Sequence, residues 1–342
     1  MRQSDRQKRT FSRREALQAM GAAAVGVTMA PSIAAAKGGE PVKVGMIGLD
    51  TSHVIAFTGT LNRAKPGDDA YGAKVVVGYP GGSPDVPASA NRVEKFTNQL
   101  RHDFGLEIVE DIPALLTKCD AVMVESVDGR PHLRQSKPVF EARKRLFIDK
   151  PFTGSLKDAQ EILELSKKHK SPFFSCSCYR FVPEIIALRN ADVGKVKEVE
   201  SSYTMSIEKH HPDLFWYGIH GVEALYTVMG KGCEWVERTA GTPIDVTKGQ
   251  WKDGRIGIFR GIRKKGAGKN GVVVRGTQGE KHNEKPKKSI YYGLMAAVVK
   301  FFQGGETPID PTETLEMIEF MTAAQLSKER NGARVKLSEL RA

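Results

Sequence analysis

The sequence predicts an α/β protein built from two successive domains, and two observations carry this prediction. Between residues 41 and 178, short β-branched runs alternate with longer segments of helical period, a pattern typical of a parallel sheet with helices on both faces. From 179 to 342, β-rich runs joined by glycine-containing connections replace that alternation and indicate a largely antiparallel sheet. A length of 342 residues is sufficient for two hydrophobic cores.

The periodicity also gives the order of the elements. In the first domain, strands are expected at 42–47, 73–78, 121–126, 145–149 and 172–176. Helices are expected near 53–64, 89–104, 111–118, 132–143 and 156–169. The strand candidates of the second domain are 195–206, 254–263 and 270–275. A closing helix is expected near residue 311, with either Thr312 as its cap or Pro311 in its first turn.

The first predicted strand runs into the turn Gly48-Leu49-Asp50-Thr51-Ser52-His53. A strand, a glycine turn and a helix in this order begin a dinucleotide-binding domain, but Asp50 and His53 replace the second and third glycines of the G-x-G-x-x-G pattern. Those glycines let the backbone approach the cofactor pyrophosphate and let the helix pack on the strand. We therefore expect a divergent nucleotide-binding turn, whose candidate cofactor-binding residues are Gly45, Gly48, Asp50, Thr51, Ser52 and His53.

Residues 1–36 are expected to form a twin-arginine export signal rather than part of the fold. Arg13 and Arg14 precede a weakly apolar stretch at 19–29, and the small residues at 34–36 resemble a cleavage site. The alternative is an N-terminal membrane anchor or a frayed helix. We expect a periplasmic or otherwise exported protein without stable membrane insertion after removal of the signal, because no later segment offers 18 uninterrupted apolar residues.

Charge and cysteine content argue against two further kinds of site. The formal net charge is +12, and many of the basic residues lie between 260 and 288 without interleaved aromatic residues. Solvated hairpin tips are therefore favoured over a polyanion patch, and no nucleic-acid partner is expected. Cys176 and Cys178 have no further ligands at metal-binding spacing, so they are expected to be buried thiols and no metal ligand is assigned.

Lys150 is the first candidate catalytic residue. It directly follows the fourth predicted strand, 145–149, and so lies at the carboxyl edge of the sheet, where open α/β sheets bind ligands. A lysine ammonium there can donate a hydrogen bond to a substrate hydroxyl and favour a developing alkoxide. The alternative is a solvent-exposed charge. Pro151 disfavours helical continuation at Lys150 and so holds it at a corner.

Three further motifs make the chain resemble a known family. The strand-turn opening and Asp149-Lys150-Pro151 are followed by Tyr179-Arg180-Phe181, Gly194-Lys195-Val196-Lys197-Glu198-Val199 and Trp216-Tyr217-Gly218-Ile219-His220. Their order and spacing resemble the Gfo/Idh/MocA oxidoreductases. The resemblance implies an N-terminal Rossmann domain at 41–178 and a C-terminal substrate and oligomerisation domain at 179–342 with an open, largely antiparallel sheet. It also implies NAD or NADP as cofactor, a sugar or polyol as substrate, and a homo-oligomer.

The resemblance also suggests roles for individual residues. Lys150 matches the lysine of the family's Glu-Lys-Pro motif, with Asp149 in place of the glutamate, and His220 matches the histidine that accepts a proton. The alternative for His220 is a core histidine. Substrate contacts are expected from Arg180, Trp216 and Tyr217. In the loop that faces the nicotinamide in relatives, the cofactor candidates are Ser126, Asp128, Arg130 and His132, to which Asp149 is added.

Three functions follow from these residues. The first is NAD(P)-dependent hydride transfer at a CH–OH group of a sugar, polyol or related carbohydrate. The second is a lyase or hydrolase acting on a keto-sugar without net redox turnover, because the glycine turn is divergent and the strand ending at Pro80 lacks the acid that would bind a ribose. The third is an exported sugar-binding protein without catalysis.

Overall fold

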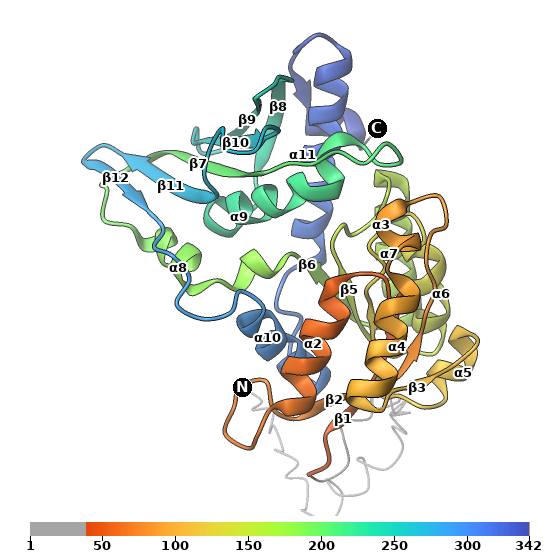
Figure 1. The fold of residues 1–342 in the computed structure, drawn as a ribbon. Helices are drawn as coiled ribbons and strands as arrows, with labels where there is room; N and C mark the ends of the chain where they lie inside the picture. Colours follow the sequence, from red (N-terminus) through yellow and green to blue (C-terminus); the bar gives the residue numbers. More distant parts are fainter. Residues whose placement is uncertain (1–38, 342) are drawn as a thin grey trace, which may run out of the picture. The chain divides into compact units, whose positions relative to one another are not determined.

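The computed structural model describes residues 39–341, and residues 1–36 with the expected export signal lie outside them. The first sheet has six parallel strands in the order β3-β2-β1-β4-β5-β6 (Figure 1). Their bounds are β1 Val42–Ile47, β2 Ala73–Tyr79, β3 Glu107–Ile108, β4 Ala121–Val124, β5 Arg145–Asp149 and β6 Phe173–Cys176. The strand order reverses between β1 and β4, which is where open parallel sheets bind ligands.

Helices cover both faces of this sheet because its strands bury apolar side chains on both sides. On one face lie α5 (Ile112–Leu116), α6 (His132–Glu141) and α7 (Leu156–His169). On the other lie α2 (Ser52–Arg63), α4 (Val93–Phe104) and, from much later in the chain, α10 (Tyr292–Phe302). A short helix, α3 (Pro87–Ala90), precedes α4. Residues 292–302 thus complete the core of the first sheet although they follow most of the second one.

The second sheet has seven strands in the order β12-β11-β7-β10-β9-β8-β13. Its strands are β7 Val196–Thr204, β8 Cys233–Thr239, β9 Ile244–Trp251, β10 Ile256–Ile262, β11 Gly271–Gly276, β12 Gly279–His282 and β13 Val335–Lys336. Only β7 and β10 pair in parallel, and the other pairs are antiparallel. The long helices α9 (Ile219–Met229) and α11 (Pro311–Glu329) pack on it through the shared apolar core.

Short helical segments join the two sheets and close the chain. They are η1 Cys178–Phe181, α8 Pro183–Ile186, η2 Ala187–Asn190, the π-helical turn η3 Leu214–Gly218 and η4 Leu337–Leu340. Among the described residues, no helix combines the length and apolar character needed to cross a bilayer. Lys281 and Lys287 are exposed as expected, but they lie in β12 and in the segment after it rather than at the tip of the β11–β12 hairpin.

The predicted fold class is confirmed: a parallel α/β sheet is followed by a mixed, mostly antiparallel one. One local prediction needs correction. The predicted strand 121–126 ends at Val124, since Glu125 and Ser126 turn away from the sheet into the loop above it. Of the two alternatives for the start of α11, the second is confirmed, because Pro311 occupies its first turn. Asp310 caps the helix by accepting a hydrogen bond from the Thr312 amide at 2.9 Å. All four cysteines are buried and free.

Candidate active site

A cavity of about 340 Å³ lies at the carboxyl ends of the strands of the first sheet, against residues of the second. Six of the predicted site residues line it: Thr51, Ser52, His53, Lys150, Tyr217 and His220. Residues that sequence reasoning did not single out also line it, among them Arg92, Tyr203, Asn270 and Tyr291. These four lie on separate elements, so no local sequence pattern marks them.

Gly48 is required by the turn. Its φ of +86° lies in the left-handed region, and a Cβ there would lie 2.5 Å from the Ser126 amide nitrogen. Gly45 needs a correction, because it lies inside β1 rather than at the cavity. A Cβ at Gly45 would meet Leu115 and Cys119, so this glycine allows helix α5 to pack, and it does not line the cavity.

The Asp50 carboxylate does not face the cavity, although it replaces the second glycine of the nucleotide pattern. The residue is fully buried, and its Oδ1 accepts a hydrogen bond from the Val127 amide at 2.8 Å. Its Oδ2 accepts one from the Ser89 hydroxyl at 2.5 Å. Burial raises the pKa of Asp50 despite these hydrogen bonds. The acid therefore ties the glycine turn to helix α3 and to the loop after β4, and it does not present its charge to a ligand at the α2 N-terminus.

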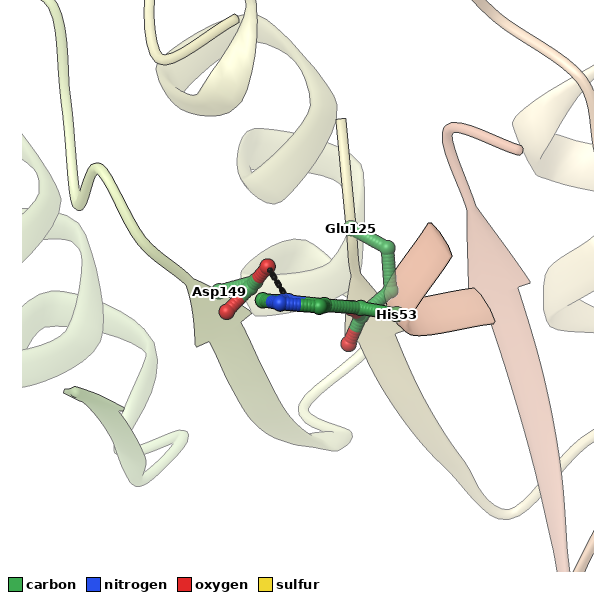
Figure 2. A group of neighbouring side chains, drawn as sticks. All are labelled: His53, Glu125 and Asp149. Carbon is green, nitrogen blue, oxygen red and sulfur yellow. Dashed lines mark hydrogen bonds and ion pairs between the residues drawn. The ribbon is translucent and has the colours of Figure 1, made fainter. Parts of the chain in front are cut away.

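His53, Asp149 and Glu125 converge beside the cavity (Figure 2). His53 Nδ1 lies 2.6 Å from Asp149 Oδ2. Burial opposes ionisation of Asp149, but the charge and hydrogen bond of His53 outweigh it and lower the pKa of Asp149. Burial, followed by the charge of Asp149, holds the pKa of Glu125 well above its ordinary value. Sequence reasoning missed Glu125; its one signal was a carboxylate directly after an apolar strand.

Lys150 and His220 approach the same cavity from different parts of the chain. Lys150 directly follows β5 and is 4% exposed, so it is not the solvated surface charge considered from the sequence. Its Nζ lies 5.6 Å from the ring centroid of Tyr217, which is 39% exposed. His220 begins α9 and is half-buried.

A chain of hydrogen bonds orients His220. Its Nδ1 lies 2.6 Å from the Ser177 hydroxyl, and the Ser177 amide donates to Glu223 Oε2 at 3.0 Å. Burial, and then the positive charge of Lys150, hold the pKa of His220 well below its ordinary value. The imidazole is therefore neutral near pH 7 and able to accept a proton.

Arg180 belongs to this supporting chain and not to the substrate surface, which corrects the role expected from the resemblance. Its side chain is buried, with Nε 2.5 Å from Glu223 Oε1 and Nη1 2.6 Å from Glu313 Oε1. Since both ends of the guanidinium are paired inside the protein, Arg180 acts on the site only through Glu223 and Ser177.

The loop after β4 is held together by its own side chains. Arg130 pairs with Asp128 at 2.7 Å and with Asp85 at 2.9 Å. Burial opposes ionisation of Asp128, but hydrogen bonds from His211 and Arg130 outweigh it and lower the pKa of Asp128.

The remaining loop candidates are also internal. His132 is buried, with Nε2 2.9 Å from the Ser126 carbonyl oxygen and Nδ1 3.1 Å from that of Phe152. The Ser126 hydroxyl lies 2.8 Å from Gln135 Nε2, which donates to it. Trp216 is buried against Val86 and Val127. The geometry therefore does not support the cofactor contacts expected from the side chains of Ser126, Asp128, Arg130 and His132, because their polar groups are bonded within the fold. It does not support the substrate contact expected from Trp216 either, because the indole ring packs inside the protein.

Comparisons with known proteins agree with the fold. Residues 42–176 match a family model described as an oxidoreductase family with an NAD-binding Rossmann fold. No curated protein matches the chain. Among solved structures, a probable dehydrogenase from Thermotoga maritima is 17% identical with a TM-score of 0.72, over 87% of this chain and 99% of that one. Scyllo-inositol dehydrogenase from Lactobacillus casei, solved with NAD(H) and scyllo-inositol, is 15% identical with a TM-score of 0.72, over 87% of this chain and 100% of that one.

The two kinds of match cover different parts of the molecule. The structural likeness extends through both sheets and shows a shared fold, whereas the family match covers the first sheet and its helices. Over residues 42–176 the chain is similar to the Gfo/Idh/MocA oxidoreductases, and the matched segment corresponds to the NAD-binding Rossmann fold of that family.

Proposed function

We propose that the protein is an NAD(P)-dependent oxidoreductase that acts on a CH–OH group of a sugar, polyol or related carbohydrate. The observation that carries this proposal is the meeting of Lys150 and His220 in one cavity with the N-terminus of α2. The dehydrogenase fold of the structural relatives, one of them solved with NAD(H) and an inositol, supports the same chemistry.

The residues of the cavity fit a nicotinamide cofactor. Thr51 and Ser52 bring the N-terminal end of α2 to the cavity, and Arg92 lines it as well. A helix N-terminus and an arginine both favour a pyrophosphate. The internal bonding of Asp50 removes the repulsion that the sequence alone suggested. When bound, the nicotinamide accepts or supplies the hydride.

Lys150 and His220 then have distinct tasks. The Lys150 ammonium donates a hydrogen bond to the substrate oxygen and stabilises negative charge as it develops there. In the tautomer in which His220 Nδ1–H donates to Ser177, Nε2 carries the lone pair and takes the hydroxyl proton. The low pKa of His220 keeps this base unprotonated at neutral pH.

The test is an absorbance assay at the nicotinamide band with NAD⁺ and NADP⁺ against a panel of inositols, aldoses and sugar acids. With a substrate found, Lys150→Met and His220→Gln are each expected to lower kcat by about 100-fold or more. Lys168→Met, which removes an exposed lysine on α7, serves as the control and should leave kcat unchanged.

Other outcomes would replace the proposal. Cleavage of a keto-sugar without net change in nicotinamide absorbance would indicate the lyase or hydrolase, and sugar binding without turnover would indicate a binding protein. Unchanged kcat in both variants would remove the assigned roles.

Two further proposals concern the environment of the enzyme. Residues 1–36 direct export by the twin-arginine route, so Arg13→Lys with Arg14→Lys should leave the protein in the cytoplasmic fraction. The protein forms a homo-oligomer through the face of the second sheet opposite α9, where alternate residues of β9 are half-exposed. Light scattering of the purified protein measures this directly, and a monomeric mass would exclude it.

A further inference from the structure

A buried cluster of one histidine and two carboxylates lies beside the cavity, and its members are His53, Glu125 and Asp149. The candidate ligand atoms of the three residues all lie within 4.8 Å of one another. They come from the start of α2 and from the carboxyl ends of the neighbouring strands β4 and β5, as Figure 2 shows. Parallel strands bring their carboxyl ends to one edge of the sheet, which explains why residues so far apart in sequence meet.

Three oxygen atoms of this cluster are buried without a hydrogen-bond partner among the described residues. They are both carboxylate oxygens of Glu125 and Oδ1 of Asp149. Glu125 is 0% exposed and Asp149 is 1% exposed. Buried carboxylates are otherwise paired, hydrogen-bonded or bound to a metal, because an isolated buried charge is costly.

Charge balance favours a cation over other ligands. A divalent ion supplies the partner that Glu125 and Asp149 Oδ1 lack, and its charge balances two carboxylate ligands. The cluster offers one imidazole nitrogen and carboxylate oxygens, a mixed set that suits Zn²⁺ or Mn²⁺ better than the all-oxygen sites of Ca²⁺ and Mg²⁺.

We propose that His53, Glu125 and Asp149 form a site for one divalent transition-metal ion. The ion takes the place of the direct contact between His53 Nδ1 and Asp149 Oδ2, which lie 2.6 Å apart. Bonds of about 2.0–2.2 Å place ligand atoms within about 4 Å of one another, so side-chain shifts of about an ångström suffice. His53 also lines the cavity, which gives the ion a route from solvent.

The test is a calorimetric titration of chelator-treated full-length protein with ZnCl₂ and, separately, MnCl₂, without nucleotide or substrate. One ion per chain is expected. Glu125→Gln and Asp149→Asn should each weaken binding by more than about 100-fold, since even residues outside the ligand shell change metal affinity by about 10–100-fold. The matched control is Glu208→Gln, because Glu208 lies 2.8 Å from His210 in a more accessible histidine–carboxylate group.

A second readout does not depend on binding heat. At an ion concentration about 100-fold above Kd, the wild-type Tm should rise by about 4 °C, and Glu125→Gln should show no rise. Circular dichroism confirms that each variant is folded. If Glu125→Gln does not fold, Asp149→Asn serves as the metal-site variant in both measurements. The proposal would be overturned if the wild-type protein did not bind one ion per chain. It would also be overturned if a folded Glu125→Gln or Asp149→Asn variant bound the ion as tightly as wild type, or if Glu208→Gln lost binding instead.

Discussion

Replacing Arg180 by methionine tests whether this arginine supports the fold or binds substrate. Arg180 is 5% exposed and Glu223, its closest partner, is 0% exposed. Methionine fills much of the same space but leaves Glu223 as an unpaired buried charge. Removing one partner of a buried ion pair costs about 3–5 kcal/mol. The second partner, Glu313, has a side chain that is 18% exposed, so water can partly solvate its carboxylate when the arginine is removed. We therefore expect the free energy of unfolding to fall by about 4 kcal/mol in total.

The pH dependence of this cost has a definite sign. Burial already raises the folded-state pKa of Glu223 above its ordinary value, and loss of Arg180 raises it further. A carboxyl group whose pKa is raised on folding binds more protons in the native state, so stability falls as pH rises through the interval between the unfolded and folded pKa values. The deficit of Arg180→Met should therefore be larger at pH 8 than at pH 5.

Chemical denaturation followed by circular dichroism measures the free energy of unfolding. Arg180→Met with Glu223→Gln is the matched comparison, because it removes both charges and should be more stable than Arg180→Met alone. An unfolding free energy equal to wild type, together with weaker ligand binding, would refute the structural role and restore Arg180 to the substrate surface.

Three other predictions concern the turn and the catalytic pair. Gly48→Ala should destabilise the protein by about 2–4 kcal/mol through left-handed strain and contact with Ser126, and an unchanged melting temperature would contradict this. Lys150→Met should raise the pKa of His220, since the lysine charge is one cause of its depression; NMR titration of the imidazole measures it, and no upward shift would count against their proximity. Ser177→Ala should lower kcat about fivefold with little change in KM, because one hydrogen bond worth about 1 kcal/mol orients the imidazole. A change confined to KM would argue for a substrate contact instead.

Most strands and helices between residues 41 and 178 could be predicted from the sequence within a few residues, whereas α10, which also covers the first sheet, could not. Their signals are local: an apolar run buried on both faces, a cap such as Ser155 before α7, and the glycine of a left-handed turn such as Gly48. The same local character made Lys150 a sound candidate, since its position after β5 fixes which edge of the sheet it reaches. Short strands such as β3 carried too few residues to be recognised.

Only the tertiary structure decided what the charged residues do. Arg180 pairs with Glu223 and Glu313, which lie 43 and 133 positions away in the sequence. His53 contacts Asp149 across a separation of 96 positions. The replacement of glycine by Asp50 suggested repulsion of a nucleotide, yet its carboxylate bonds to Ser89 and to the loop after β4. A charge in a sequence has no fixed role, because its energy depends on burial and on partners that only the folded chain brings within hydrogen-bonding distance.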